Sequence, residues 1–264
     1  MRLIPSNKPS LDQLGLPPAV RAFADHHSGL VLVTGRTGSG KSTTLAAAIE
    51  HINQTRAAHI ITIEDPIEYL HPHKKCIVNQ REVGADTADI VDALRRVARQ
   101  DADVIFVSDL TDGDCISEAL AVAAAGRLVL GVMNTLSVVD TLNWIVTRQE
   151  PSAQEHTRTL LARVLRGIVC QRLVDRADGR GRLAAVESLT ATPKVRDAIA
   201  TGAEPALIER LMSEGDYHGM ATFDQALFQL FSDDLVTLDE ALDRAAHPED
   251  LRIAVQQAGL ASLH

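Results

Sequence analysis

Several features that define other classes of protein are scarce in this sequence. Aromatic residues make up only 3% of its 264 residues, and three cysteines occur. The wide, odd spacing of Cys76, Cys115 and Cys170 matches neither a disulfide framework nor a zinc site, so we expect reduced thiols that pack as small hydrophobes. The longest mostly apolar stretch, residues 119–133, contains Arg127 and is shorter than the roughly 20 residues of a membrane-spanning helix. The sequence therefore predicts no transmembrane helix.

An excess of positive charge is also lacking. Acidic residues outnumber basic ones by 35 to 26, which gives a net charge of −9 at pH 7. This is the wrong sign for unassisted binding to a phosphate backbone, so nucleic acid is not an expected partner. The first residues, MRLIP, lack the apolar core of a signal peptide, and we expect a cytoplasmic protein.

From residue 31 onward, short β-branched runs alternate with longer helical patterns. This alternation predicts an α/β fold with a mainly parallel sheet. The expected strands are residues 31–34, 59–63, 76–79, 104–107, 128–133 and 183–188, and the expected helices between them are residues 41–53, 88–99, 114–125, 138–147 and 153–169. After residue 190 only helices are expected, at residues 193–200, 205–213, 222–231 and 238–245. We therefore divide the chain into a proline-containing connector (1–28), a core (29–190) and a helical region (191–264).

A phosphate-binding loop follows the first expected strand. Residues 35–42, GRTGSGKS, match the pattern G-x-x-x-x-G-K-[ST] between a strand and a helix, as this motif requires. Glycines let backbone N–H groups converge on the β-phosphate at the positive end of the helix dipole. Lys41 would supply charge to the β- and γ-phosphates, and Ser42 would bind Mg²⁺. The expected contacts to ATP are Gly35, Thr37, Gly38, Ser39, Gly40, Lys41, Ser42 and Thr43.

The loop alone does not identify a reaction, because kinases, GTPases and motors share it. The sequence has no N-K-x-D pattern for reading guanine, which argues against a GTPase. Glu64 directly follows the expected strand at residues 59–63, so it lies at the edge where open α/β sheets bind ligands. Acidic residues after a strand also cap turns, so the position alone leaves both roles open for Glu64.

Four stretches carry a resemblance: GLVLVTG at residues 29–35, KSTTL at 41–45, HIITIEDPIE at 59–68 and NQREVG at 79–84. Together they closely resemble the PilT/PilU family of secretion-type ATPases, which drive type IV pilus retraction. The resemblance covers essentially the whole chain, and TFDQAL at residues 222–227 looks closer to the PilU branch. It implies a RecA-like core, a helical C-terminal part and a ring of six protomers with ATP at their interfaces.

The resemblance also implies roles for particular residues. Glu64, in the family's Asp box, would orient or deprotonate the attacking water. Asp109 would end the Walker B strand near Mg²⁺. The family has Gly-Glu where this chain has Ser108-Asp109, so the carboxylate of this chain is on a side chain one methylene shorter. Misplacement of a catalytic group by about 1 Å can lower the rate about a hundredfold. Asn134 replaces the histidine of the family's His box and could still donate a hydrogen bond towards a γ-phosphate. Arg127 also replaces a family histidine, so we interpret both changes as departures in one γ-phosphate sensor.

Three arginines match arginines of the family. Arg81 matches one of them, and Arg95 and Arg99 match others near the subunit boundary, where arginines can neutralise a neighbour's γ-phosphate. Four residues apart on one expected helix, Arg95 and Arg99 could equally be solvated charges paired with Asp92 or Asp101. A metal site in the stretch HPHKKC at residues 71–76 is not expected, because its proline and two lysines disfavour one.

Two functions stay open. Family members carry a further N-terminal domain, whereas this sequence begins at the linker into the core. The chain could be a Mg²⁺-dependent retraction ATPase in a homo-hexamer, or in a mixed hexamer with a full-length retraction ATPase, at the inner-membrane platform protein of the pilus. Alternatively, Asp109, Asn134, Arg127 and the short start could mark a catalytically impaired paralogue that binds ATP and regulates a full-length partner. A small-molecule kinase would explain far fewer residues.

Overall fold

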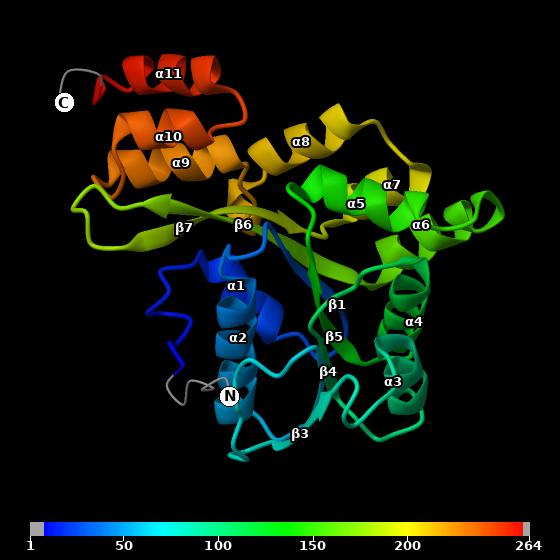
Figure 1. The fold of residues 1–264 in the computed structure, drawn as a ribbon. Coiled ribbons are helices and arrows are strands. Elements are labelled where there is room, and N and C mark those ends of the chain that lie inside the picture. Colours follow the sequence, from blue (N-terminus) through cyan, green and yellow to red (C-terminus); the bar gives the residue numbers. More distant parts are fainter. Residues whose placement is uncertain (1–7, 261–264) are drawn as a thin grey trace.

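A seven-stranded sheet forms the centre of the computed structural model, which describes residues 8–260 (Figure 1). The strand order is β3-β2-β4-β5-β1-β6-β7, and every neighbouring pair is parallel except β6 and β7. The strands are β1 (Gly29–Thr34), β2 (His59–Glu64), β3 (Ile77–Glu82), β4 (Val104–Val107), β5 (Leu128–Met133), β6 (Leu165–Asp175) and β7 (Arg182–Thr190). The expected α/β class and the mainly parallel sheet are confirmed.

Helices cover both faces of the sheet. They are α1 (Pro18–Ala24), α2 (Lys41–Thr55), α3 (Ile90–Val97), α4 (Gly113–Ala124), α5 (Val138–Thr147), α6 (Gln154–Val164), α7 (Pro193–Thr201), α8 (Pro205–Ser213), α9 (Phe223–Ser232), α10 (Leu238–Arg244) and α11 (Pro248–Gln257). One apolar layer is formed with α1 and α2, and the opposite layer with α3, α4, α5 and α6. Because both faces are covered, β1, β4 and β5 are buried along their whole length.

The helix expected at residues 153–169 is wrong in its last part. Helix α6 ends at Val164, and the chain continues as strand β6 from Leu165. Gly167 lies directly against α1, since a Cβ atom added there would lie 2.2 Å from the ring of Phe23. The backbone of β6 is instead paired with β1 on one side and with β7 on the other. These long-range contacts override the local helical pattern.

Helix α1 lies within residues 1–28, where the sequence analysis expected a connector; the first part of that segment, including Pro5, lies outside the described residues. Proline suits the first position of a helix, and Pro18 occupies it in α1. The side chain of Phe23 is 3% exposed and packs with residues of α2 and the sheet. Residues 18–24 therefore contribute to the packing of the core.

Replacing Phe23 with alanine is expected to lower the free energy of unfolding by about 3 kcal/mol, because the buried ring leaves a cavity that α1 cannot close over Gly167. Urea denaturation followed by circular dichroism measures the loss. Ile253→Ala is the control, since this side chain on α11 is 49% exposed. Equal stability losses in the two variants would show that α1 does not belong to the cooperative core.

The chain after β7 is helical, as expected, and includes α11, which the sequence analysis did not predict. Helix α9 begins with a capping box, in which Thr222 and Gln225 each accept a hydrogen bond from the other's backbone N–H. Phe223, Leu227 and Phe231 recur along one face of α9 and are buried in a cluster with residues of β6 and β7. In Figure 1, α9, α10 and α11 lie together beyond the β6–β7 hairpin.

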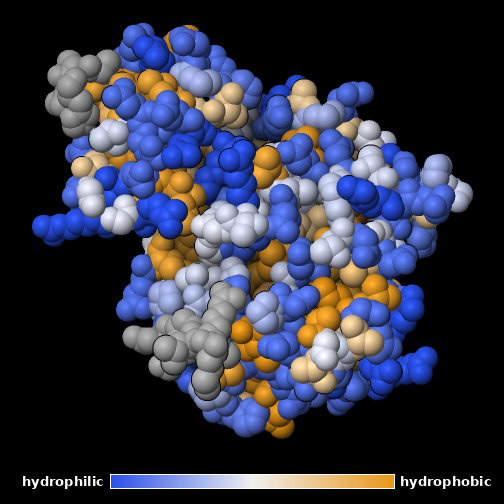
Figure 2. Space-filling view, in the orientation of Figure 1, coloured by the Kyte–Doolittle hydropathy of each residue, from blue (hydrophilic) through white to orange (hydrophobic). Residues whose placement is uncertain are grey.

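The surface drawn in Figure 2 is mainly hydrophilic, with hydrophobic residues in smaller patches between the polar ones. The largest fully buried side chains include Leu32 and Ile61 in the sheet and Phe223 at the start of α9. Across residues 8–260, no helix combines the length and the apolar character that crossing a membrane requires.

Candidate functional site

The phosphate-binding loop connects the buried strand β1 to helix α2 at the carboxyl edge of the sheet. Gly35, Gly38 and Gly40 have φ angles of 138°, 82° and 92°, a region that side chains disfavour. A Cβ atom on Gly35 would lie 2.4 Å from the carbonyl oxygen of Gln171, so the loop packs directly on β6. The glycines therefore give the loop the compact backbone that a phosphate group needs at the N-terminus of α2.

Lys41 links this loop to the end of strand β5. Its Nζ donates hydrogen bonds to the carbonyl oxygens of Gly35 (2.8 Å) and Arg36 (3.0 Å) and to Oδ1 of Asn134 (3.0 Å). Asn134 in turn donates from Nδ2 to Oδ1 of Asp109, at 3.5 Å. Burial lowers the pKa of Lys41, while the negative charge of Asp109 opposes this shift. Three residues predicted from separate motifs thus form one chain of contacts.

Asp109 and Asn134 meet because they follow neighbouring parallel strands, β4 and β5. The N–H of Leu110 donates to the carbonyl oxygen of Val132 at 2.8 Å, which holds the two strand ends together. Burial raises the pKa of Asp109, and the charge of Lys41 acts in the opposite direction. An acidic side chain therefore lies within the same small polar cluster as the lysine of the phosphate-binding loop.

Glu64 ends strand β2 and is buried, with 4% of its surface exposed. Its Oε1 accepts hydrogen bonds from the hydroxyl of Thr62 (2.6 Å) and from Nε2 of Gln80 (2.9 Å), and its Oε2 accepts one from the N–H of Glu68 (3.4 Å). Burial raises the pKa of this carboxyl, and the three hydrogen bonds moderate the shift. A buried, oriented carboxylate with a raised pKa is suited to act as a general base.

Two residues of this region were missed by the sequence analysis. Gln80 donates from Nε2 to both Glu64 and the carbonyl oxygen of Tyr69, so it fixes the carboxylate against the loop after β2. The Tyr69 hydroxyl lies 3.0 Å from the hydroxyl of Thr43 and connects the same loop to α2. Gln80 lies directly before Arg81 in the NQREVG stretch that carried the resemblance.

Two pockets flank the phosphate-binding loop. One of about 70 Å³ has Ser42 and Glu64 in its wall, at the start of α2 and the end of β2. The other, of about 410 Å³, is lined by residues 35–39 and by cationic side chains, namely Arg36, Arg172, Arg182 and Arg244. Ser39 has a buried hydroxyl with no hydrogen-bond partner among the described residues.

These groups fit a nucleotide with its magnesium ion. The glycine loop and the cations of the larger pocket suit a polyphosphate. Mg²⁺ binds oxygen ligands, and in phosphate sites it uses one or two protein groups together with the phosphates. The Ser42 hydroxyl and the Asp109 carboxylate are the oxygen donors that would hold it.

Of the three candidate arginines, Arg95 lines a pocket of about 590 Å³ together with Asp65 and Asp109. Arg81 donates to Oε1 of Gln100 at 2.9 Å, and Arg95 forms an exposed ion pair with Glu118 of α4 at 2.7 Å. In the alternative interpretation as a solvated charge, Arg95 is exposed but pairs with Glu118 and not with Asp92 or Asp101. Arg99 lies beyond the end of α3, so it does not share a helix face with Arg95. Their role at a subunit boundary stays a prediction.

Arg127 also lies outside the site. Its carbonyl oxygen accepts a hydrogen bond from Gly29 at the beginning of β1, whereas Asn134 follows the other end of β5. Strand β5 has six residues, and a strand rises about 3.3 Å per residue, so Arg127 and Asn134 lie about 20 Å apart. The interpretation of both residues as parts of one γ-phosphate sensor is wrong, because the two ends of a strand face opposite edges of the sheet.

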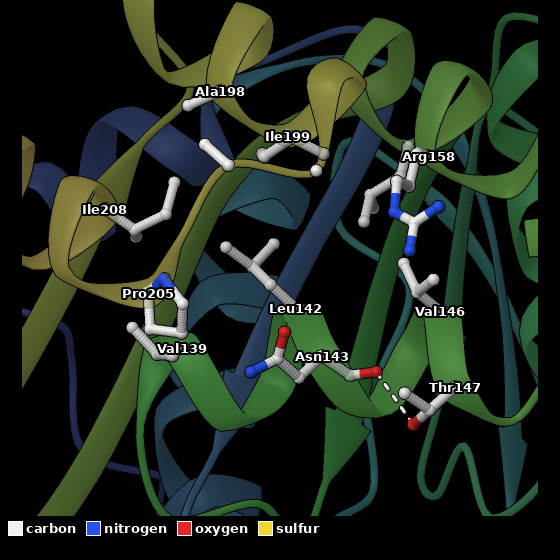
Figure 3. Close-up of a pocket in the computed structure, with 13 residues that line it drawn as sticks. Val139, Leu142, Asn143, Val146, Thr147, Arg158, Ala198, Ile199, Pro205 and Ile208 are labelled. Atoms are coloured by element: carbon white, nitrogen blue, oxygen red, sulfur yellow. Dashed lines mark hydrogen bonds between the residues drawn. The ribbon is translucent and has the colours of Figure 1, made fainter. Parts of the chain in front are cut away.

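A further pocket lies between α5, α6, α7 and α8 and does not adjoin the loop (Figure 3). It has a volume of about 100 Å³, and apolar side chains such as Leu142, Ile199 and Ile208 form most of its wall. Arg158 is the one charged residue of this wall. Within residues 8–260, this mainly apolar wall contains no carboxylate that could hold Mg²⁺, so the pocket is not the candidate site.

Known proteins resemble the whole chain. Residues 1–216 match the model of the family described as Type II/IV secretion system protein. The chain is 39% identical over 249 residues to the type IV pilus retraction ATPase PilT of Pseudomonas aeruginosa, and the match covers 94% of this chain and 72% of the relative. It is also 39% identical over 256 residues to the type IV pilus ATPase PilU of the same organism, with 97% and 67% covered.

A solved structure agrees with these relatives. The crystal structure of the pilus retraction motor PilT with bound ADP matches with a TM-score of 0.88 at 42% identity, and the match covers 96% of this chain and 71% of that chain. The resemblance stated from the sequence motifs is confirmed. The PilT and PilU relatives are equally identical to the chain, so overall identity does not favour the PilU branch suggested by residues 222–227.

Proposed function

Because the chain belongs to the Type II/IV secretion system protein family, we propose that it is a Mg²⁺-dependent ATPase subunit that drives type IV pilus retraction. The relatives named as pilus ATPases and the motor with bound ADP support this function. One observation carries it: the chain of contacts from Lys41 through Asn134 to Asp109 lies at the same sheet edge as the pocket of Ser42 and Glu64.

Each residue has a distinct task in this proposal. The backbone N–H groups of residues 35–41 bind the β-phosphate, and Lys41 exchanges its bonds to the Gly35 and Arg36 carbonyls for phosphate oxygens. Thr37, Ser39 and Thr43 complete the contacts to the nucleotide. Ser42 and Asp109 hold Mg²⁺, which neutralises charge on the phosphates. Glu64 accepts a proton from the attacking water, and its raised pKa improves this step near neutral pH.

A steady-state assay of phosphate release by the purified chain tests this function. We expect ATP turnover that depends on Mg²⁺ and that is lost when Lys41 is replaced by alanine. Equal phosphate release by the two proteins would remove the ATPase assignment.

A catalytically impaired ATP-binding partner is the second candidate. It is favoured by the identity of the two residues that meet beside Lys41: Asp109 is one methylene shorter than glutamate, and the amide of Asn134 cannot become cationic. Misplacement of a catalytic group by about 1 Å can lower the rate of the chemical step about a hundredfold. Nucleotide binding could therefore persist while the rate of hydrolysis falls.

The double substitution Asp109→Glu with Asn134→His separates the two candidates. If the chain is impaired, we expect kcat to rise about tenfold or more, because the longer carboxylate and the imidazole reach further towards the phosphates. The affinity for ADP serves as the control and should stay constant. An unchanged or lower kcat would argue against the impaired partner and for a motor adapted to Asp109 and Asn134.

Assembly and location extend the same proposal. Residues 29–190 would form the ATPase core and residues 191–264 the helical region, with residues 1–28, whose helix α1 packs on that core, as the linker that leads into it. The subunit would act in a homo-hexamer, or in a mixed hexamer with a full-length retraction ATPase. Arg81, Arg95 and Arg99 would then lie near the nucleotide of a neighbour. The ring would work on the cytoplasmic side at the pilus platform protein of the inner membrane.

A further inference from the structure

The stretch HPHKKC at residues 71–76 contains two histidines that the proposed site does not use. His71 is 7% exposed and lines the pocket that also contains Ser42 and Glu64. His73 is exposed, and its Nδ1 accepts a hydrogen bond from the N–H of Val78 at 3.0 Å. The two imidazoles therefore have different surroundings, and His71 alone is placed beside the candidate general base.

Lys8 determines which nitrogen of His71 carries the proton. Its Nζ lies 3.1 Å from Nδ1 of His71 and donates to the carbonyl oxygen of Leu70 at 2.5 Å. An ammonium group only donates hydrogen bonds, so Nδ1 of His71 accepts one. A neutral imidazole that accepts at Nδ1 carries its proton on Nε2. The structure thus assigns a donor, and not an acceptor, to the remaining ring nitrogen.

Burial, together with the positive charge of Lys8, keeps the His71 ring neutral. Lys8 lies 3.5 Å from the carboxylate of Glu50, which also binds Lys74. On the pocket side, the ring shares the wall with Glu64, Asp65 and Glu68. Burial and the positive charge of Lys8 lower the pKa of His71 to about 4, although Glu50 opposes the shift. The ring is therefore uncharged at neutral pH.

Gln80 holds His71 and Glu64 in one arrangement. The backbone N–H of His71 donates to Oε1 of Gln80 at 2.8 Å, and Nε2 of the same amide donates to Oε1 of Glu64 at 2.9 Å. The side chain of Gln80 thus binds the backbone of His71 through its oxygen and the carboxylate of Glu64 through its nitrogen. Among the described residues, the hydrogen bond of the His71 ring is the one between its Nδ1 and Lys8, and Nε2 is the ring nitrogen left for the pocket.

We propose that His71 is a further catalytic residue of ATP hydrolysis, and that its Nε2–H donates a hydrogen bond to the attacking water in the pocket shared with Glu64. This inference rests on the proposed ATPase function. The water gives one proton to Glu64, and its oxygen forms a bond to the γ-phosphorus. The bond from that phosphorus to the β–γ bridging oxygen breaks, and ADP leaves with the electron pair. His71 keeps its proton and orients the water through one lone pair, while Glu64 accepts from its O–H.

The ring tautomer tests the geometry without any turnover. Nitrogen-15 NMR of the labelled full chain, with His71→Gln to assign the signals, should show a neutral His71 protonated at Nε2 near pH 7. In Lys8→Met the proton should spread over both ring nitrogens, and the pKa of His71 should rise towards its ordinary value. A wild-type ring protonated at Nδ1, or doubly protonated at pH 7, would overturn the inference.

Kinetics test the role in hydrolysis. Loss of one oriented hydrogen bond in His71→Leu should lower kcat about tenfold and leave the KM for ATP unchanged. His71→Gln restores an N–H at a similar reach and should recover most of kcat, whereas a residue that only supports packing would not be rescued in this way. His73→Leu is the matched control and should behave as wild type. If His71→Leu has the same kcat as the wild type, only the inference about His71 is overturned. If the wild type itself shows no turnover, the proposed ATPase function is overturned as well.

Discussion

Lys41→Ala should weaken the binding of ATP about a hundredfold. In the proposed complex the ammonium group donates charge-assisted hydrogen bonds to phosphate oxygens, each worth about 1.5–3 kcal/mol. Loss of about 3 kcal/mol corresponds to roughly a hundredfold in affinity. The groups that Lys41 contacts are neutral, namely the carbonyl oxygens of Gly35 and Arg36 and the amide oxygen of Asn134, so none of them replaces its charge. The reduced affinity should apply to ADP as well, since the loop binds the β-phosphate.

Isothermal titration calorimetry with ATP and ADP in the presence of Mg²⁺ measures this effect. Lys75→Ala is the matched control, because this lysine is exposed and its Nζ contacts only the carbonyl oxygen of Thr55 among the described residues. Circular dichroism establishes that both variants are folded. Binding heats for Lys41→Ala equal to those of the wild type would contradict the nucleotide site.

Glu64→Gln should lower kcat about a hundredfold to ten-thousandfold, the range of general acid–base catalysis, with little change in ATP affinity. Glutamine retains the shape of the side chain, and its carbonyl oxygen can still accept from Thr62 and Gln80. It cannot take a proton from water. The defect should therefore appear in the chemical step and not in binding.

The dependence of turnover on pH gives a second measure of Glu64. Burial raises the pKa of this carboxyl above its ordinary value, and the base works only when ionised. Turnover of the wild type should therefore fall with decreasing pH at a higher pH than an ordinary carboxyl would cause. The residual activity of Glu64→Gln should lack this acid limb. Glu249→Gln, which removes an exposed charge on α11, is the control, and a loss of kcat as large as that of Glu64→Gln would contradict the assignment.

The parts of the fold that depend on short-range patterns were predicted well. The bounds expected for β4, β5, α5 and α8 coincide with those observed. The phosphate-binding loop could also be identified, because its glycines, its lysine and its flanking elements all lie within about one strand and one helix of each other. The meeting of Asp109 with Asn134 was not predicted, because it depends on the pairing of β4 with β5, which brings the carboxyl ends of both strands to one edge.

The remaining features depend on contacts between distant segments. The sequence pattern of residues 165–169 predicts the continuation of a helix, yet these residues form a strand because they pair with β1 and β7. Arg127 and Asn134 are seven positions apart in the sequence, yet β5 carries them to opposite edges. Glu64, Gln80 and His71 come together only because β2 and β3 are paired and Lys8 reaches the loop after β2.

Sequence patterns thus specify which short segments form strands and helices and where the glycine-rich loop lies between them, because backbone propensity and glycine conformation act over a few residues. The tertiary structure decided which nitrogen of His71 can donate, which partner Arg95 binds and how the pKa of Glu64 shifts. Hydrogen bonding, ion pairing and desolvation depend on neighbours in space, and the chain acquires those neighbours only when the sheet is assembled.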